Sequence, residues 1–187
     1  MTGNHGRLHP GSSLVGFDEV ARERLDGMLA TYGFLVEMSK EEAGFAMRRF
    51  RNGQRYITVE AAAQKGQYPV GRVKLGTGSA DWPEGDWNQI PLGRLIEEKR
   101  PDRSAADYPL DNLTLASFLD TAAKDLQDYA MDFIAGELFA FKRLRAEAAK
   151  QKPAYELFGS GPYSENTLEY MRVSKLLKEK YSSEAAA

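Results

Sequence analysis

Hydrophobic and polar residues alternate along two runs that flank Asn52-Gly53, FAMRRFR before this pair and QRYITVE after it. Asn-Gly between runs rich in aromatic and β-branched residues is typical of a two-residue hairpin turn. A third run, YPVGRVKL, follows after a short loop, and residues 34–38 alternate in the same way before the first run. Residues 39–43 are interpreted as a turn. The pattern therefore predicts a three- or four-stranded antiparallel meander.

The hairpin turn also predicts which side chains share a face of the sheet. With Asn52 and Gly53 at its centre, Arg51 lies opposite Gln54, and the pairing continues outward from there. Because successive side chains point to opposite faces of a strand, the expected core face carries Ala46, Phe50, Ile57 and Val59, with Arg48 and Arg55 towards its rim. The opposite face mixes aromatic, basic and polar side chains: Phe45, Met47, Arg49, Arg51, Tyr56, Thr58 and Glu60.

Helical periodicity dominates the rest of the chain. Apolar residues recur at three- and four-residue spacing over residues 16–32, while Asp18 and Asp26 are expected to face water, and Gly33 is expected to end this helix. A short helix is predicted over residues 91–99 and a long helical region over residues 113–151, which Gly136 can break. The expected fold is α+β, with the meander packed against an N-terminal helix and long C-terminal helices.

The chain divides into three parts on this interpretation. Residues 1–15 lack periodicity and are expected to be a flexible leader, and residues 16–151 are expected to form a single α+β domain. Residues 152–187 are predicted to be a linker and a final helix that Ser164 caps. This helix has apolar residues on more than one side, so it needs a second surface, either in its own domain or on another chain.

Composition narrows the possible functions. The 187 residues include no cysteine, which excludes disulfides, a thiol nucleophile and thiolate metal ligands. No run of 18 apolar residues is present, so neither a membrane span nor a membrane partner is expected. The first residues lack the apolar region of a signal peptide and cysteine is absent, so cytoplasmic residence is the default expectation. The net charge is −2, yet residues 44–76 hold seven basic residues and one acidic residue. That distribution leaves +6 in the predicted sheet and −8 elsewhere, and internal pairing of the two is the favoured interpretation.

Few residues could carry catalysis. The two histidines, His5 and His9, lie in the leader, and no G-x-S-x-G motif is present, so neither a metal site nor a Ser-His-Asp triad is expected. No cofactor is expected either. Acidic residues crowd one loop that also holds two tryptophans: Asp81, Glu84 and Asp86, with Trp82 and Trp87. An acid/base or cation site in the Asp81–Asp86 loop is therefore one alternative.

The aromatic-basic face of the meander is a second alternative site. Arg49, Arg51 and Tyr56, joined by Arg72 and Lys74, would form a platform for single-stranded nucleic acid. The RNP1 pattern is absent, however, and the isoelectric point of about 5.8 is lower than that of most nucleic-acid-binding domains. We favour the structural interpretation, in which arginine stems cover the sheet and their guanidinium groups reach carboxylates on a neighbouring helix.

Several short motifs resemble those of a loose group of uncharacterised bacterial α+β proteins of the toxin-immunity type. The motifs are Tyr32-Gly33-Phe34 after the first helix, the strand segment FRNGQRYITVE, the segment IPLGRLI at residues 90–96, and YAMDFIAGELFAF at residues 129–141. The resemblance covers residues 17–144 and brings no catalytic residue. It implies a small cytosolic binding protein, by analogy of fold alone.

The interpretation favoured by the sequence is a non-enzymatic protein-interaction module. The missing catalytic machinery, the uneven charge and the final helix support it, and a protein partner or self-association is expected. Nucleic-acid binding through the Arg49–Arg51–Tyr56 face and an enzyme or cation site in the acidic tryptophan loop remain as alternatives.

Overall fold

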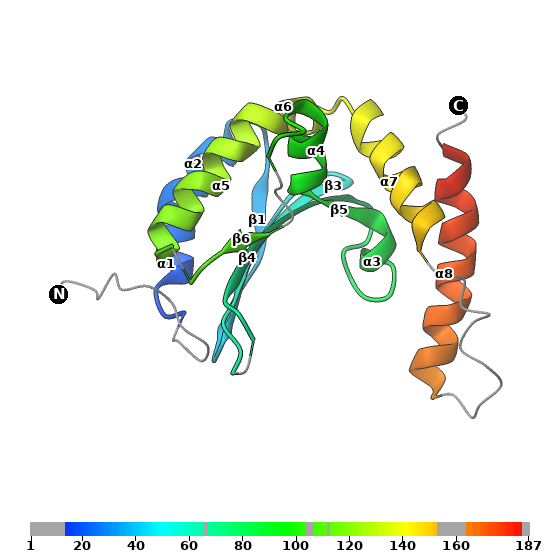
Figure 1. The fold of residues 1–187 in the computed structure, drawn as a ribbon, viewed down its shortest axis with the longest axis horizontal. Coiled ribbons are helices and arrows are strands. Elements are labelled where there is room, and N and C mark those ends of the chain that lie inside the picture. The colour runs from blue at the N-terminus through cyan, green and yellow to red at the C-terminus, as the bar shows by residue number, and fades with distance from the viewer. Residues whose placement is uncertain (1–13, 66, 104–106, 112, 153–163, 185–187) are drawn as a thin grey trace.

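An antiparallel sheet organises the molecule, with most of the helices over one of its faces and the C-terminal pair of helices beside one end of it (Figure 1). The computed structural model of the chain describes residues 14–65, 67–103, 107–111, 113–152 and 164–184. It confirms the predicted α+β class, with an N-terminal helical segment and several C-terminal helices beside the sheet. The expected leader and linker fall mostly outside the described residues. Leu14 is buried, so the described core begins two residues before the expected domain.

Four long strands follow one another in both sequence and space: β1 (Leu35–Glu42), β2 (Phe45–Asn52), β3 (Arg55–Ala62) and β4 (Val70–Thr77). Two short strands that the sequence did not predict also pair with β4, namely β5 (Gln89–Pro91) and β6 (Tyr108–Pro109). All pairs are antiparallel, so the four-strand form of the predicted meander is present with two additions at one side.

The predicted hairpin is present, but its turn lies one residue further along the chain. Asn52 pairs with Arg55, so Gly53 and Gln54 form the turn, and Gly53 alone has a positive φ, of 57°. Glycine at the first central position is typical of a type II′ turn rather than the expected type I′. The Asn52 side-chain amide donates to the Tyr32 carbonyl oxygen at 2.8 Å, which explains why this residue extends the strand. The pairing differs by two residues from the prediction, and the predicted faces are therefore correct.

The predicted turn over residues 39–43 is wrong, because β1 continues to Glu42 and reverses at Ala43-Gly44, where Gly44 has a φ of 75°. Contacts with the N-terminal helix explain the longer strand. The Ser39 hydroxyl donates to Asp18, and the Glu41 carboxylate accepts the backbone N–H groups of Gly16 and Asp18. Polar residues in this segment thus hold β1 against the helix.

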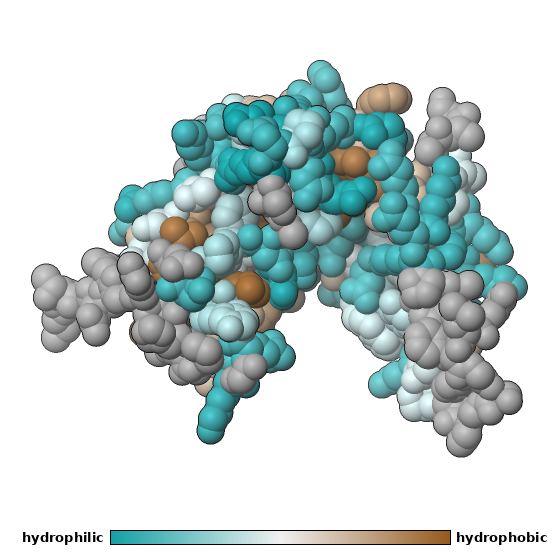
Figure 2. Space-filling view, viewed as in Figure 1, coloured by the Kyte–Doolittle hydropathy of each residue, from teal (hydrophilic) through white to brown (hydrophobic). Residues whose placement is uncertain are grey.

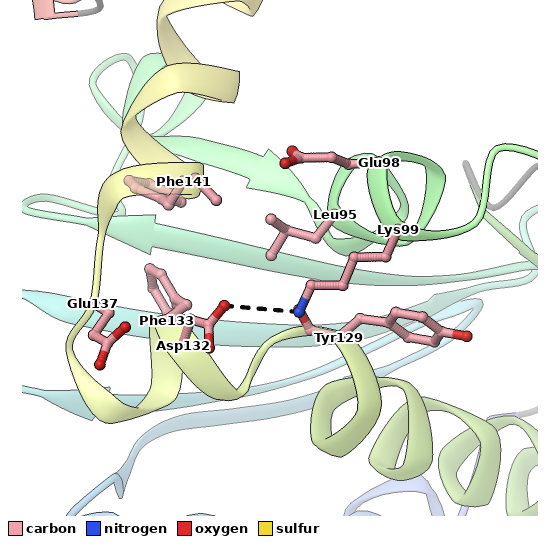
Figure 3. Close-up of a pocket in the computed structure, with 9 residues that line it drawn as sticks. Leu95, Glu98, Lys99, Tyr129, Asp132, Phe133, Glu137 and Phe141 are labelled. Carbon is pink, nitrogen blue, oxygen red and sulfur yellow. Dashed lines mark hydrogen bonds and ion pairs between the residues drawn. The ribbon is translucent and has the colours of Figure 1, made fainter.

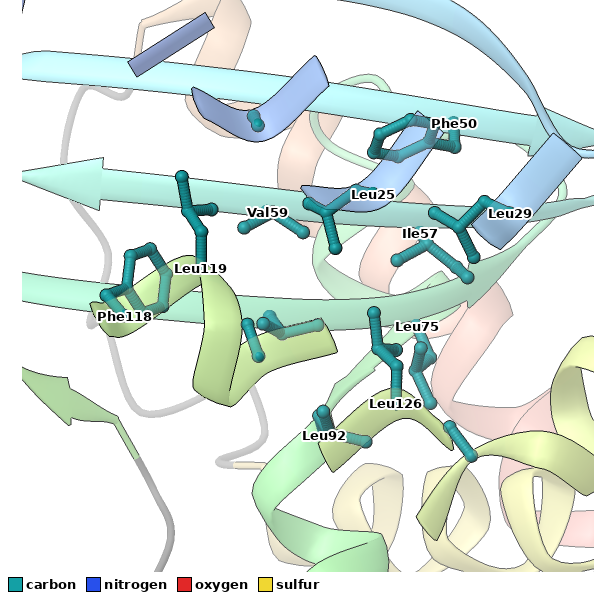
Figure 4. Close-up of a cluster of buried hydrophobic side chains, with 14 of the residues drawn as sticks. Leu25, Leu29, Phe50, Ile57, Val59, Leu75, Leu92, Phe118, Leu119 and Leu126 are labelled. Carbon is teal, nitrogen blue, oxygen red and sulfur yellow. The ribbon is translucent and has the colours of Figure 1, made fainter. Parts of the chain in front are cut away.

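The apolar face of the sheet, here called the inner face, forms the main core with the helices above it (Figure 4). The segment predicted as the first helix comprises α1 (Phe17–Ala21), the π-helical turn η1 (Arg22–Asp26) and α2 (Gly27–Ala30), and Gly33 follows with a φ of 76°. Leu25 and Leu29 from this segment pack with Phe50, Ile57 and Val59 of the sheet. The predicted short helix is α4 (Leu92–Lys99), which adds Leu92, Leu95 and Ile96.

The long helical region divides into three helices: α5 (Leu115–Tyr129), α6 (Met131–Ala135) and α7 (Phe139–Gln151). Gly136 ends α6 with a φ of 106°, as the sequence suggested. The Arg55 guanidinium donates to the carbonyl oxygens of Phe133 and Ile134, where the negative end of α6 favours a cation. This contact joins the start of β3 to the connection between α6 and α7.

The final helix, α8 (Glu165–Glu184), packs within the same chain, against α7 and the short α3 (Gly85–Asn88). Ser164 caps it as predicted, since its hydroxyl accepts the Thr167 backbone N–H. A small second cluster lies at this junction, composed of Trp87, Ala149 and Tyr181, with Leu177 packed beside them. The Trp87 indole donates to the Ser174 hydroxyl at 3.0 Å. This helix therefore packs on its own domain, whereas its Leu168 and Leu176 are 53% and 58% exposed.

One arginine on the inner face links the sheet to the first helix. Arg48 is buried, and it donates two hydrogen bonds to Asp26, at 2.9 and 2.6 Å, and one to Asp18. These two carboxylates were expected to face water and instead neutralise a buried charge. The Ser39 hydroxyl and the Arg48 guanidinium hold the pKa of Asp18 below its ordinary value. Internal pairing of the basic sheet with an acidic helix is thus present at this position.

Asp18→Asn should make the protein less stable at neutral pH and less sensitive to acid. The pKa of the Asp18 carboxyl group is lower in the folded state than its unfolded-state value of 3.8. The ionised group therefore stabilises the fold above pH 3.8, and this stabilisation is lost as the pH falls through the folded-state pKa. After allowance for solvent screening, we expect a loss of about 1 kcal/mol at pH 7. Urea unfolding at several pH values between 7 and 3 should show the difference from wild type shrinking with acidity. Asp128→Asn, at an exposed position, is the control, and an equal pH dependence in both variants would contradict the prediction.

Candidate functional site

Alternation along β2, β3 and β4 brings the predicted platform residues together on the face opposite the core, here called the outer face. Arg49, Arg51 and Tyr56 occupy neighbouring positions there, with Arg72 and Lys74 on the next strand. The grouping that the sequence predicted is therefore present in space. Its chemistry depends on what each of these side chains contacts.

Tyr56 is the centre of this group and is fully buried. The Arg49 and Arg51 guanidinium groups lie 5.8 and 5.2 Å from the centroid of its ring, in cation–π contact. Tyr56 covers Gly76, its partner on β4, so closely that a β-carbon on the glycine would fall 2.1 Å from the ring. Burial raises the pKa of the Tyr56 phenol, although the two arginines oppose this shift. The ring is thus not available for stacking on a base.

Carboxylates neutralise the arginines of this group. Arg51 forms a two-pronged ion pair with Glu37 and donates to the Gly78 carbonyl oxygen at 3.0 Å. Arg49 lies 3.8 Å from both Glu37 and Asp81. The pairing of β1 with β2 shifts between Val36 and Met38, and the extra residue is Glu37. This bulge aims the Glu37 carboxylate at the arginines, as bulges commonly redirect side chains.

The other two basic residues are paired in the same manner. Lys74 lies 2.7 Å from Glu60, and Arg72 lies 3.2 Å from Asp107 and 3.8 Å from Glu60. Four basic side chains therefore meet four carboxylates, so the outer face has little net positive charge. The partners come from strands and loops rather than from the neighbouring helix that the sequence analysis invoked. Such a surface lacks the excess of cations that backbone-directed nucleic-acid binding requires.

The two tryptophans of the acidic loop have different roles. Trp82 is 56% exposed, and its ring stacks on Tyr170 of α8 with centroids 5.6 Å apart, whereas Trp87 is buried. Lys152 lies 4.3 Å over the Trp87 ring and donates to the Asp86 carbonyl oxygen, and burial lowers the pKa of this lysine. Trp87 is thus part of the packing of α8.

The acidic residues of the same loop do not form a cation site. Asp81, Glu84 and Asp86 are exposed. Across the described residues, no group of three or more acidic, histidine or cysteine side chains is arranged to hold a metal ion. The loop is therefore a surface element that α8 packs against, and the cation-site alternative lacks the geometry it needs.

A pocket between α4, α6 and α7 is too small for a ligand (Figure 3). Its volume is about 20 Å³, which holds about one water molecule. Lys99 lines the pocket, and its ammonium group lies 3.7 Å from Asp132 (Figure 3) and 3.3 Å from the Tyr129 carbonyl oxygen. The pocket is therefore a packing gap, and the ion pair of Lys99 with Asp132 is part of its wall.

The outer edge of β1 is a candidate site that the sequence analysis missed. β1 ends the strand order, and each of its eight residues is exposed. Leu35, Val36 and Met38 are 70%, 43% and 41% exposed, although the side of the molecule seen in Figure 2 is mostly hydrophilic. Its polar second half was interpreted as a turn, so no strand edge was expected there. An open strand of this length is a template for pairing with another chain.

Gly76→Ala should destabilise the fold because the added methyl group would overlap the Tyr56 ring. We expect a loss of about 1–3 kcal/mol in urea unfolding, the range of overpacked cores. In a Tyr56→Ala background the same change should be nearly neutral. Gly27→Ala is the control, since nothing lies within 4 Å of its added carbon, and it should stabilise slightly. Equal losses at Gly76 in both backgrounds would contradict the close approach.

Arg51→Met should lower the free energy of unfolding by about 1–2 kcal/mol, because Glu37 and the Gly78 carbonyl oxygen lose their donor. A double-mutant cycle with Glu37→Gln measures the pair directly. We expect a coupling energy of at least about 0.5 kcal/mol, as is usual for residues in contact. Lys65→Met, at an exposed position, is the control. Additive losses at Arg51 and Glu37 would show that the arginine is not neutralised by this carboxylate.

Comparisons with known proteins provide no relative whose function could be compared with this site. No protein-family model, no curated protein and no solved structure matches the chain. None of the helices among the described residues is long and apolar enough to cross a bilayer. The resemblance to toxin-immunity proteins stays a prediction.

Proposed function

We propose that this chain is a protein-interaction module that binds an extended segment of a partner protein along the free edge of β1. The observation that carries the proposal is an eight-residue edge strand that is exposed along its whole length. Addition of a partner strand to such an edge is a recurring mode of peptide recognition, in which backbone hydrogen bonds supply much of the affinity.

The hairpin geometry indicates which backbone groups of β1 are open to a partner. Paired residues next to a two-residue turn exchange hydrogen bonds, and bonded and non-bonded pairs alternate from there. Glu42 pairs with Phe45 beside the turn, so Glu41 and Ser39 fall on non-bonded pairs. Their N–H and C=O groups point away from β2. These two residues therefore offer four backbone groups to an added strand.

The side chains of β1 favour a particular kind of partner. Exposed apolar residues, Leu35, Val36 and Met38, lie at its start. Its end carries the two carboxylates of Glu41 and Glu42 against one ammonium group, that of Lys40, which lies 3.0 Å from Glu42, so a net negative charge remains there. An antiparallel partner strand would meet the glutamates with its first residues and the apolar residues with its last. We therefore infer a segment that is basic at its beginning and apolar at its end.

A second copy of this chain is a poorer occupant of the edge. Antiparallel pairing of β1 with itself places Glu41 and Glu42 opposite Leu35 and Val36, so charged and apolar side chains would meet at both ends. The bulge at Glu37 also breaks the regular ladder, and bulges and edge charges restrain indiscriminate pairing. The geometry thus supports one defined partner over self-association.

The neutralised outer face supports the same choice over nucleic-acid binding. Each basic side chain of the platform already contacts a carboxylate, as described above. A nucleic acid would have to displace these partners to reach the cations. Nucleic-acid binding through Arg49, Arg51 and Tyr56 therefore stays a prediction that this arrangement does not favour.

Selection of displayed random peptides on the whole chain tests the proposal. We expect recovered peptides to place basic residues before apolar ones. Leu35→Glu combined with Met38→Glu should weaken their binding by at least about tenfold, because exposed apolar contact is replaced by charge. On binding, hydrogen exchange measured by NMR should slow at the Ser39 and Glu41 amides.

Tyr68→Glu combined with Phe139→Glu provides the control, since these residues are exposed apolar positions outside β1. This variant should bind the selected peptides as the wild type does. Failure to enrich any peptide, equal loss in both double variants, or unchanged exchange at Ser39 and Glu41 would each overturn the proposal.

A further inference from the structure

A cleft opens where the end of the sheet meets α7 and α8, apart from the edge of β1. Its volume is about 490 Å³, within the range of small-molecule sites. Thr77 and Ser79 contribute hydroxyl groups from the end of β4 and the loop after it. Figure 1 shows the helices that close the opposite side, α7 and α8, packed next to each other. Segments distant in the sequence thus form one concave surface.

Basic side chains outnumber acidic ones among the described residues that line this cleft. Among the described residues that line it, Lys142 and Arg145 reach it from α7 and Lys180 reaches it from α8, whereas Glu84 is acidic. The chain as a whole is acidic, with a net charge of −2. Like charges in a concave site repel one another, so an anion that binds among them relieves that repulsion.

The two lysines differ from the basic residues of the outer face in their surroundings. Within the described ranges of the chain, no carboxylate lies within 4 Å of the Lys142 or Lys180 ammonium group. Every basic residue of the outer platform, by contrast, has a carboxylate at that distance. The cleft therefore offers positive charge that the outer face does not.

Arg145 is held rigidly in the cleft, and it is only 4% exposed. Its guanidinium carbon lies 3.8 Å from the centroid of the Tyr181 ring and 5.0 Å from that of Phe141. One of its terminal nitrogens donates to the Thr77 hydroxyl at 2.7 Å. A guanidinium fixed in this way is preorganised, so little side-chain entropy is lost when a ligand binds beside it.

We propose that this cleft binds a small molecule that carries a phosphate group. The phosphate lies among Lys142, Arg145 and Lys180, and the rest of the ligand contacts the hydroxyl groups of Thr77 and Ser79. Convergent cations suit a phosphate because it carries more than one negative charge and several acceptor oxygens. A polynucleotide fits less well, because the exposed carboxylates of Asp81, Glu84 and Asp86 lie along the loop beside the cleft.

Titration of the full chain with four probes tests the proposal: inorganic phosphate, pyrophosphate, ATP and glucose 6-phosphate. A single-stranded oligonucleotide is titrated in parallel for comparison. NMR chemical shifts and calorimetry should both show saturable binding of at least one probe, with shifts at Ser79 and Lys180. Binding of the esters at least about tenfold more tightly than inorganic phosphate would identify a phosphate ester as the ligand class. Equal binding would identify the free anion.

Lys142→Glu combined with Lys180→Glu should weaken that binding by at least about tenfold. Both side chains are exposed, so this variant should fold, and its circular dichroism and urea unfolding verify that. Lys124→Glu combined with Lys175→Glu is the matched control, because it makes the same charge change at exposed positions outside the cleft. The control variant should bind like the wild type.

Three results would overturn the proposal. They are the absence of saturable binding of any of the four probes, an equal loss of affinity in the two double variants, and binding of single-stranded polynucleotide alone. The titration does not involve the edge of β1, so its outcome is independent of the peptide-binding experiment.

Discussion

Burial of the inner face of the sheet is the constraint on which the rest of the structure depends. Strand alternation places Phe50, Ile57, Val59 and Leu75 on one side, where each such side chain contributes roughly 1.5–3 kcal/mol when removed from water. These residues require a cover, which the N-terminal helical segment, α4 and α5 supply. Successive side chains of a strand point to opposite faces of the sheet. Because the apolar residues are buried on the inner face, the residues between them, including Arg49 and Arg51, lie on the outer face.

The charged side chains of the sheet lie where strand alternation and core packing place them, and ion pairs form around them there. Arg48 falls on the inner face and is retained there by Asp18 and Asp26, because a buried cation without partners would be very unfavourable. On the outer face, Glu37 and Glu60 come from the strands themselves, so the sheet neutralises much of its own charge. The overall asymmetry of charge along the chain therefore does not produce an equally asymmetric surface.

Alternation made the strands and their faces predictable, whereas contacts between distant residues decided what was missed. The faces were predicted correctly despite the displaced turn, since a shift of two residues preserves the side of every side chain. The turn itself depends on the bond from Asn52 to the Tyr32 carbonyl oxygen, which local sequence does not reveal. Residues 39–43 lacked an apolar period because an edge strand can be exposed throughout. The clustering of Arg49, Arg51 and Tyr56 was predicted, but their carboxylate partners, including Glu37 in a bulge, were not.

Helical periodicity likewise predicted where helices occur in the sequence better than where they lie in the folded molecule. The Gly136 break and the Ser164 cap are local signals, and both were found where expected. The cleft between Thr77 and Lys180 joins segments from different parts of the chain, and no spacing in the sequence connects them.

The attachment of α8 has a consequence for how the molecule opens. The buried cluster beneath this helix is small, with Trp87, Ala149 and Tyr181 as its members, and it is separate from the main core. Segments held by few buried apolar contacts open at lower free energy than the whole domain unfolds. The C-terminal helix is therefore expected to detach as a local unit while the sheet stays folded. Detachment would expose Trp87 to water and quench or shift its fluorescence, and it would carry Lys180 away from α7.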